Sequence, residues 1–391
     1  MNAAIIGAGP AGLAAAEILS EAGVTVTILD RMPSPARKFL MAGRGGLNLT
    51  HTEPLEPFLS RYGPARPRLE PAIRAFPPEA IREWADALGA ETFAGTSGRV
   101  FPRAMKAAPL LRAWLARLAA RGTTLLPRHS WTGWDETGAL TFARPGAEPL
   151  HLTPDATLLA LGGASWPRLG SDGGWAPILA ARGIALAPFA PANSGLLIDW
   201  SAHLRDRHAG TPLKRIALTF AGRTIRGEAI ITAKGLEGGA VYALSAAIRD
   251  EVAARGEATI TLDLRPDMTT EEVARRMALP RRGQSLSNHL RRQLTLPPAA
   301  IALLREGPAA PESAIKTLAL RVTGLAGLDR AISTAGGLRW EELDDHFALK
   351  KLPDTHAAGE MLDWEAPTGG HLLTACLATG RSAAQGMLRG R

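Results

Sequence analysis

The sequence of 391 residues has little cysteine, and this shortage excludes several classes of protein. Its single cysteine, Cys376, rules out an internal disulfide framework, a cysteine-ligated metal site and a CxxC redox pair. We therefore expect a reducing, cytoplasmic environment and no metal, with any electron transfer depending on a bound cofactor. No apolar run reaches the ~20 residues that span a bilayer. The apolar start lacks the basic segment of a signal peptide, so no membrane association is expected.

Acidic residues are also in short supply. The chain has 45 Lys and Arg against 37 Asp and Glu, a formal net charge of +8. Because no long basic run has interleaved aromatics, and tyrosine occurs only twice, nucleic-acid binding is not favoured. The densest basic stretch, Arg281–Arg292, is interpreted as a solvated helix face, and the excess as a bias of the whole chain. A diffuse positive charge also suits an anionic cofactor or substrate.

The first thirty residues predict a strand, a helix and a strand. Ala3–Gly7 is a short apolar run, Pro10–Ala22 has helical apolar spacing, and Val24–Leu29 is rich in β-branched residues. Such a βαβ unit belongs to a parallel sheet that is covered on both faces. The sequence therefore predicts an α/β fold at the start of the chain.

The pattern changes near residue 190. Residues from about 192 to 330 show alternating segments that suit antiparallel strands, and arginine-rich helical stretches follow from Thr270. Glycine-centred motifs resume at Ser333. We predict one domain built from residues 1–190 and 331–391, with a second domain, 191–330, inserted between its parts. Within the first part, Arg31–Thr50 and the Pro/Arg-rich segment Arg61–Pro71 are expected to be loops.

A glycine motif of the form GxGxxG lies between the first strand and the helix. Its three glycines permit a tight turn, close approach to a pyrophosphate, and close helix–strand packing. An acidic residue ends the next strand, where it can accept from a ribose hydroxyl and would repel a 2′-phosphate, which favours FAD or NAD over NADP. The predicted dinucleotide-binding residues of this segment are Gly7, Gly9, Pro10, Ala11, Gly12, Asp30 and Arg31.

Three further segments have glycines and polar donors where a cofactor would pass close to the backbone. The segment Lys38–Thr50 has three glycines, with donors at Lys38, Arg44 and Asn48. A predicted strand ends at Gly162 and Gly163, and the loop Gly170–Gly174 that follows suits either a ligand contact or a helix start capped by Ser171 or Asp172. Near the C-terminus, a glycine–acid pair precedes a double glycine that opens a helix, which is typical of an anion-binding or carbonyl-binding helix start. The candidates in these segments are Lys38, Gly45, Gly46, Leu47, Asn48, Gly162, Gly163, Gly359, Glu360, Asp363, Gly369, Gly370, His371 and Leu372.

Together with Gly98–Pro102 (GRVFP), these motifs resemble the bacterial FAD-dependent flavoproteins related to aminoacetone oxidase and to the bile-acid 3-oxo-reductase type. The resemblance implies a Rossmann-type, glutathione-reductase-like FAD-binding domain, interrupted by an inserted β-barrel plus helical domain. It implies that the first glycine motif holds the FAD pyrophosphate and Asp30 the adenosine ribose. Glu360 and Asp363 would approach the ribityl chain and pyrophosphate, and the start of the last helix would contact the flavin.

Two departures from the family pattern bear on these expectations. Asp30 stands where relatives commonly carry glutamate, and its shorter reach should still serve the ribose. Leu47 stands where many relatives have an Arg-Cys pair, which leaves the substrate open.

The activity expected is that of an NAD(P)/FAD-dependent oxidoreductase that passes hydride from NAD(P)H through FAD to a small organic substrate between the two domains. Because no second GxGxxG exists, NAD(P)H is expected to bind transiently. Three alternatives stay open: an FAD-dependent oxidase of a small amine or hydroxy substrate that uses oxygen, a flavin-dependent nucleic-acid modifying protein, and a flavin-binding protein without turnover.

The catalytic acid or base is not identified by the sequence. His371 is the best placed histidine, although a backbone contact is its expected role. Possible substrate contacts are Ser165, Arg99 and Lys106. The histidines expected at the surface are His203, His208, His289 and His346, and Trp166 and Trp364 are expected to pack in the core.

Overall fold

The predicted βαβ unit lies at the centre of a six-stranded sheet. The computed structural model, which describes residues 1–43 and 45–390, orders the strands β20-β21-β10-β1-β2-β6, and all neighbours are parallel except β20 and β21. Apolar side chains of β1 are buried on both faces, as expected for a covered parallel sheet. The strands are β1 Asn2–Ile6, β2 Thr25–Asp30, β6 Thr124–Pro127, β10 Ala156–Leu159, β20 Ala348–Leu349 and β21 Leu352–Ala357. This is the predicted Rossmann-type fold.

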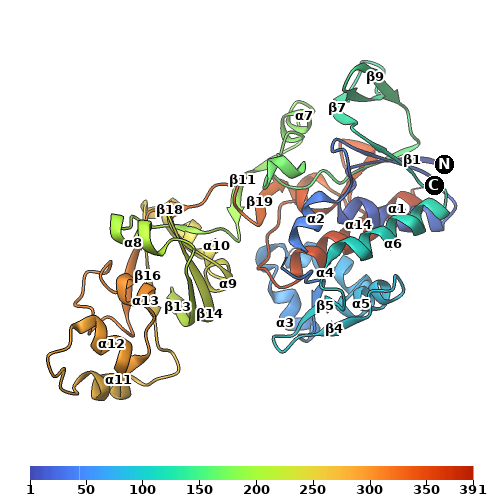
Figure 1. Ribbon diagram of the computed structural model, residues 1–391. Helices are drawn as coiled ribbons and strands as arrows, with labels where there is room; N and C mark the ends of the chain where they lie inside the picture. Colours follow the sequence, from blue (N-terminus) through green and yellow to red (C-terminus); the bar gives the residue numbers. More distant parts are fainter. Residues whose placement is uncertain (44, 391) are drawn as a thin grey trace. The chain divides into compact units, whose positions relative to one another are not determined.

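Helices from both ends of the chain pack together on this sheet. The first helix, α1 (Pro10–Glu21), lies against the last helix, α14 (His371–Arg389), drawn in blue and red in Figure 1. The two backbones come so close that a Cβ on Gly380 would lie 2.2 Å from the Ala11 carbonyl oxygen. The close packing joins the two glycine-rich ends of the sequence in one layer, together with α6 (Ala107–Ala120).

Two segments predicted as loops contain helices. Arg66–Ala75 forms α4, so the prediction of a loop at Arg61–Pro71 is wrong. Pro67 stands in the first turn, where no backbone N–H is needed, and Glu70 pairs with Arg66 and Arg74 one turn away on either side. The segment Arg31–Thr50 likewise contains a short helix, α2 (Arg37–Ala42).

Smaller elements complete this part of the chain. One three-stranded sheet has the order β3-β5-β4, another has the order β7-β8-β9, and β11 pairs with β19. Their bounds are β3 Thr50–His51, β4 Thr92–Ala94, β5 Arg99–Pro102, β7 Ser130–Trp134, β8 Leu140–Arg144, β9 Ala147–Leu152, β11 Leu186–Ala192 and β19 Ser333–Leu338. The remaining helices are α3 Leu55–Ser60, α5 Pro78–Asp86 and α7 Ala176–Ala180.

Antiparallel strands form a barrel-like sheet in the middle of the chain. The order is β17-β16-β13-β14-β15-β12-β18, and a single residue, Thr323, separates β17 from β18. Because the two end strands follow one another along the chain, the sheet curls round on itself. The strands are β12 Leu196–Leu197, β13 Pro212–Phe220, β14 Arg223–Thr232, β15 Gly235–Glu237, β16 Ala258–Asp263, β17 Leu318–Val322 and β18 Gly324–Leu325. The helices are α8 Ala202–His208, α9 Gly239–Tyr242, α10 Ser245–Arg255, α11 Thr270–Met277, α12 Leu286–Leu294 and α13 Pro298–Leu303.

The chain divides into two compact units, each with its own hydrophobic core. Unit 1 comprises Met1–Ala190 and Ser333–Arg391, and unit 2 comprises Pro191–Ile332. In the described part of the chain, every helix is too short or too polar to span a bilayer.

Candidate cofactor site

The GxGxxG loop joins β1 to α1, and each glycine has a different reason to be there. Gly7 has φ +108°, and a Cβ there would lie 2.2 Å from the Ala160 carbonyl oxygen. A Cβ on Gly12 would lie 2.0 Å from the carbonyl oxygen of Gly7. Gly9 has no atom within 4 Å of its Cβ position. Two glycines therefore pack the loop, and the middle one leaves open space beside the helix start.

A cavity of about 350 Å³ opens at this loop. Its wall is made by the ends of β1, β2 and β10, by α2 and by the turn after β21, so it lies at the carboxyl edge of the parallel strands, where such folds bind ligands. Ten of the predicted cofactor residues line it: Gly7, Gly9, Pro10, Ala11, Asp30, Arg31, Lys38, Gly162, Gly359 and Glu360.

Asp30 is anchored to the glycine loop. Its two carboxylate oxygens accept backbone N–H bonds from Ala8 and Met32, each at 2.8 Å. Burial raises the pKa of Asp30, although these two hydrogen bonds act to lower it. Since a carboxylate oxygen can accept more than one hydrogen bond, the geometry leaves Asp30 able to accept from a hydroxyl in the cavity.

Lys38 ties α2 to the C-terminal motif. Its Nζ donates to both carboxylate oxygens of Glu360, at 2.7 and 2.9 Å, and to the Ser165 hydroxyl at 2.6 Å. Glu360 belongs to a 3-10 turn, η4 (Gly359–Met361), and also accepts from the Thr334 N–H at 3.1 Å. Ser165 is fully buried, and its hydroxyl helps to fix the position of the Lys38 ammonium group.

Two buried polar atoms at the cavity wall have no partner. The Nε of Arg37 and the Oγ of Ser171 are both buried without a hydrogen bond, and both residues line the cavity. An unpartnered buried donor is costly, and an anionic or hydroxyl-bearing ligand would satisfy it. Open space at Gly9, an acidic acceptor and these two donors together fit the pyrophosphate and ribose groups of FAD. The sequence interpretation missed Arg37, although it adjoins Lys38.

The loop Gly170–Gly174 has a different role from a helix start. The helix α7 begins at Ala176 and its N-cap, Trp175, makes no side-chain cap bond, so the prediction of a cap by Ser171 or Asp172 is wrong. Asp172 instead pairs with Arg31 and accepts from the Gly174 N–H at 3.0 Å. Burial raises the pKa of Asp172, but these contacts outweigh that effect and hold the pKa below its ordinary value. The Arg31–Asp172 pair thus lies at the cavity wall.

A second group of candidates meets at the start of α14, away from this cavity wall. A Cβ on Gly370, which has φ +97°, would lie 2.4 Å from the Thr50 Cα. With its amide oriented to satisfy both atoms, Asn48 donates to the Thr50 carbonyl at 2.9 Å and accepts from the Gly370 N–H at 3.1 Å. Leu47 is buried in the core and donates its N–H to Met105. This part of the Lys38–Thr50 segment, which was predicted to lie close to the cofactor, is therefore held against the start of the last helix.

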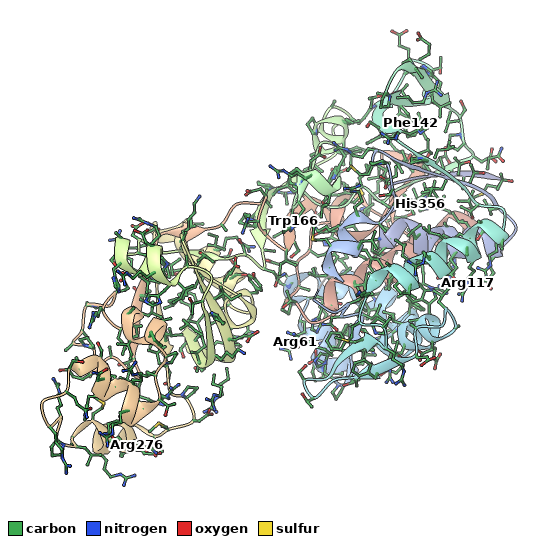
Figure 2. The ribbon with its side chains drawn as sticks, viewed as in Figure 1. Arg61, Arg117, Phe142, Trp166, Arg276 and His356 are labelled. Carbon is green, nitrogen blue, oxygen red and sulfur yellow. The ribbon has the colours of Figure 1, made fainter. Side chains whose placement is uncertain are left out.

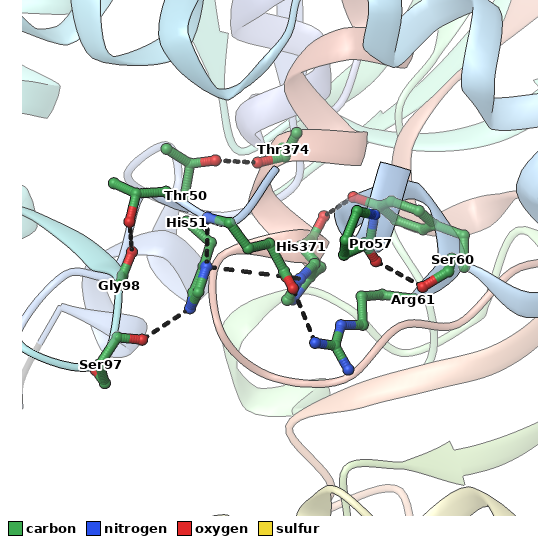
Figure 3. A network of polar contacts seen from close by, with 12 residues as sticks. Thr50, His51, Pro57, Ser60, Arg61, Ser97, Gly98, His371 and Thr374 are labelled. Carbon is green, nitrogen blue, oxygen red and sulfur yellow. Dashed lines mark hydrogen bonds and ion pairs between the residues drawn. The ribbon is translucent and has the colours of Figure 1, made fainter. Parts of the chain in front are cut away.

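Glu53 is the centre of a polar network at this helix start, and its partners His51, Arg61 and His371 are labelled in Figure 3. Its carboxylate accepts from His371 Nε2 at 2.9 Å and from the Arg61 guanidinium at 2.8 Å, and its N–H donates to His51 Nδ1 at 3.0 Å. Tyr62 donates its hydroxyl to the carbonyl of His371 at 2.8 Å. Burial raises the pKa of Glu53, but its hydrogen bonds to Arg61 and His371 outweigh this and hold the pKa below its ordinary value. For His371, burial lowers the pKa, although the hydrogen bond to Glu53 opposes this shift. The pair is therefore a neutral imidazole donating to a carboxylate, with His371 Nδ1 buried and unpartnered.

The remaining candidates do not line the cavity: Gly12, Gly45, Gly46, Gly163, Asp363, Gly369 and Leu372. Asp363 follows a bridge between Leu338 and Leu362, and its carbonyl accepts from the Trp340 indole at 2.7 Å. Burial raises the pKa of its carboxyl group. Arg44 lies outside the described residues.

One of the predicted surface histidines is buried. His289 is only 1% exposed, so the prediction that it lies at the surface is wrong. Inside unit 2 its Nε2 donates to the Met277 carbonyl at 3.2 Å. Trp364 packs in the core of unit 1 near Tyr62. Cys376 lines the cavity, and burial raises the pKa of its thiol to about 12. Among the described residues, no three His, Cys, Asp or Glu side chains are grouped to hold a metal ion.

Comparison with known proteins extends over almost the whole chain. A family model described as "HI0933-like protein Rossmann domain" matches residues 1–386. The chain is 26% identical over 405 residues to the "3-dehydro-bile acid delta(4,6)-reductase" of Clostridium scindens, covering 96% of each chain. It is 25% identical over 398 residues to the "Ribosomal RNA dihydrouridine synthase" of Escherichia coli, covering 95% of this chain and 94% of that one.

The fold is shared with a steroid dehydrogenase of known structure. The 3-ketosteroid delta1-dehydrogenase of Sterolibacterium denitrificans superposes with a TM-score of 0.56 at 12% identity, covering 100% of this chain and 99% of that one. At this identity the likeness concerns the arrangement of the elements.

Proposed function

The chain belongs to the HI0933-like FAD Rossmann family, whose class is that of FAD-dependent oxidoreductases, and from that premise we propose that it reduces a small organic acceptor with electrons from NAD(P)H. The observation that supports this most is the cavity at the GxGxxG loop, where Asp30 can accept from a hydroxyl and Arg37 and Ser171 present unpartnered buried atoms. When bound, FAD supplies two-electron chemistry between a donor and an acceptor.

The residues of this chain would bind and orient the cofactor. Gly9 admits the pyrophosphate to the start of α1, where the helix dipole favours an anion. Asp30 would hold the adenosine ribose, and the other cavity-lining candidates would complete the nucleotide site. Lys38 neutralises Glu360, which permits an anion to lie beside that carboxylate without like-charge repulsion.

The start of α14 would lie against the flavin side. The Gly370 N–H donates to Asn48, and Gly370 packs against the backbone of Thr50. The N–H groups of the first helical turn, from His371, have no acceptor within the helix. Such donors would stabilise negative charge on the bound cofactor. Glu53 would hold the His371 ring in one tautomer, with Nε2 protonated, while burial disfavours the charged form of the ring.

The two curated relatives suggest which acceptors to test. Both names describe the reduction of carbon–carbon double bonds, in a 3-oxo bile acid and in a uracil ring, and in both substrates the double bond is conjugated to a carbonyl group. We propose an acceptor of that kind, an α,β-unsaturated carbonyl compound, for this chain.

A test of the acceptor compares two compounds. The NADPH-reduced or NADH-reduced protein, prepared without oxygen, is mixed with a conjugated enone or with the corresponding saturated ketone. We expect the absorbance of oxidised flavin to return when the enone is added, and not when the saturated ketone is added. A flavin that stays oxidised with NADH and NADPH, but that a small amine or hydroxy compound reduces and oxygen reoxidises, would instead support an oxidase.

A second candidate, reduction of a base in RNA, is supported by a specific observation. The positive charge of the chain is concentrated in unit 2, where 20 Lys and Arg stand against 14 Asp and Glu, while unit 1 has 25 against 23. A polyanionic substrate would fit that distribution, and one curated relative is named for ribosomal RNA.

A further inference from the structure

The positive charge of unit 2 is gathered in one segment. Between Glu272 and Glu306 the sequence has no acidic residue and no lysine, but it has seven arginines. This segment contains the end of α11, all of α12 and the loop between them. The arginines are Arg275, Arg276, Arg281, Arg282, Arg291, Arg292 and Arg305. The excess charge is therefore local, which corrects the interpretation of a bias spread over the whole chain.

Most of these guanidinium groups are exposed and not neutralised. Arg275, Arg282 and Arg292 are exposed and make no ion pair with a described residue. Arg281 has its nearest carboxylate oxygen, on Glu312, at 3.9 Å, and Arg291 donates to the Asn288 amide oxygen. We name these five exposed side chains the arginine face.

The arginine-rich helix α4 of unit 1 is the contrasting case. Arg66 contacts Glu56 and Glu70 at 2.6 and 2.8 Å, and Arg74 contacts the same two carboxylates. There the arginines are paired within the helix layer. An arginine-rich composition thus does not by itself leave guanidinium groups free. The arginine face differs from α4 because three of its five arginines make no ion pair with a described residue and a fourth, Arg281, has only a distant one.

The helices α11 and α12, which flank the loop of the arginine face, are held to one another. His289 holds the Met277 carbonyl, and Arg276, labelled in Figure 2, bonds to Glu272 at 2.6 Å and to the Gln293 carbonyl at 3.1 Å. Ser285 caps α12 by accepting the Asn288 N–H. The arginine face is therefore presented on a packed scaffold, which lowers the entropy lost when it binds a partner.

We infer that the arginine face binds the phosphate backbone of RNA. Planar guanidinium groups pair with phosphate in a two-bond geometry and also stack on bases, and arginine rather than lysine supplies every cation here. A membrane surface fits less well, because Val273, Leu290 and Leu294 are buried in the core of unit 2 and leave no apolar helix face for lipid. Leu279, 49% exposed, is the large apolar side chain at the surface of the described part of unit 2.

This inference rests on the second candidate function and adds the surface that would hold the substrate. The experiment measures the binding of a fluorescent single-stranded RNA to the FAD-loaded protein over a range of salt concentrations, with DNA of the same sequence and anionic phosphatidylserine vesicles as parallel arms. The test variant combines Arg275→Ala, Arg282→Ala and Arg292→Ala. The control variant combines Arg103→Ala, Arg112→Ala and Arg389→Ala, which removes the same charge from exposed positions of unit 1.

We expect the native protein and the control to bind RNA alike. The test variant should lose affinity on the order of 10-fold at low salt, and its plot of log affinity against log salt should be shallower by about 2, since each phosphate contact on a single strand contributes about 0.7. Equal loss in both variants, unchanged affinity in the test variant, or stronger binding to vesicles or DNA than to RNA would overturn the inference. FAD content and reduction by NAD(P)H are measured on the same samples, because their failure would contradict the proposed function and not the arginine face.

Discussion

The two units of this chain are built from different sequence features. In unit 1, glycines permit backbones to approach one another closely, as at Gly7 and Gly380, and a cavity opens where Gly9 leaves space. In unit 2, a sheet curls into a barrel-like form and a helical layer carries exposed arginines, three of which make no ion pair with a described residue. The nearly neutral unit 1 therefore has the geometry of a nucleotide site, while the positively charged unit 2 has a surface suited to a large anion. Four changes test this division, from the largest effect to the smallest.

A bulky charge at the open glycine should remove the cofactor. We expect Gly9→Glu to abolish FAD retention, because the new carboxylate would occupy the space beside the start of α1 and repel a pyrophosphate. The measurement is the ratio of flavin to protein after purification. Gly239→Glu is the matched control, since Gly239 also stands at a helix start in open space, but in unit 2. A fully yellow Gly9→Glu variant would show that the nucleotide site lies elsewhere.

The neighbouring glycine should matter for folding rather than for the ligand alone. A methyl group on Gly7 would meet the Ala160 carbonyl oxygen and occupy a φ of +108°. We expect Gly7→Ala to lower the free energy of unfolding by about 3 kcal/mol, from backbone strain and overpacking together. Gly9→Ala should change it by less than about 0.5 kcal/mol. Urea titration of both variants without added FAD checks this, and equal stability would refute the packing role given to Gly7.

Loss of the acidic acceptor should weaken FAD binding without abolishing it. Asp30→Ala would remove the proposed hydrogen bond to the ribose and the two bonds that hold the loop, so we expect a loss of about 1–3 kcal/mol in FAD affinity. Asp30→Asn, which keeps one acceptor oxygen, should lose less. Titration of the apoprotein with FAD measures both. Unchanged affinity in Asp30→Ala would contradict the ribose contact.

The histidine of the Glu53 network should make stability depend on pH. Burial lowers the folded-state pKa of His371 below the ordinary 6.5, so the unfolded chain binds its proton first as the pH falls. The stability that the neutral ring provides is complete above pH 6.5 and is lost below it, by at most about 1.4 kcal/mol per pH unit.

The matched variants isolate this contribution. Between pH 7 and pH 5.5, His371→Gln should lose less stability than the native protein, and His203→Gln, at an exposed site, should behave as the native protein does. Thermal melts at the two pH values provide the comparison. The same pH response in all three proteins would mean that His371 is not the titrating group.

The sequence predicted what depends on local spacing. The βαβ unit, the GxGxxG loop with Asp30, and the last helix follow from periodicity and glycine spacing, and the family and the Rossmann-type fold are confirmed. The helix α4 was missed because its two prolines indicate a loop, whereas the packing that stabilises it is long-range: Leu69, Ala72 and Ile73 are buried and the helix lies against α14.

Long-range packing accounts for what the sequence left out. Burial of His289 depends on α12 packing against the end of α11, and the meeting of Arg37 and Ser171 in the wall of one cavity depends on segments over 130 residues apart. These two features are set by contacts between distant segments, which spacing along the chain does not encode. The concentration of charge in unit 2, by contrast, is a property of the sequence itself, because the predicted second domain, 191–330, has nearly the bounds of that unit.

The most direct test of the account is an absorbance spectrum of the purified protein without oxygen, with identification of the extracted flavin, before and after NADH or NADPH. We expect bound FAD that bleaches with one of the two nucleotides, in both the native protein and the Arg275→Ala, Arg282→Ala, Arg292→Ala variant. FAD that stays oxidised with both nucleotides would contradict the NAD(P)H-dependent proposal. A protein that holds no flavin even after reconstitution would contradict the cofactor site itself.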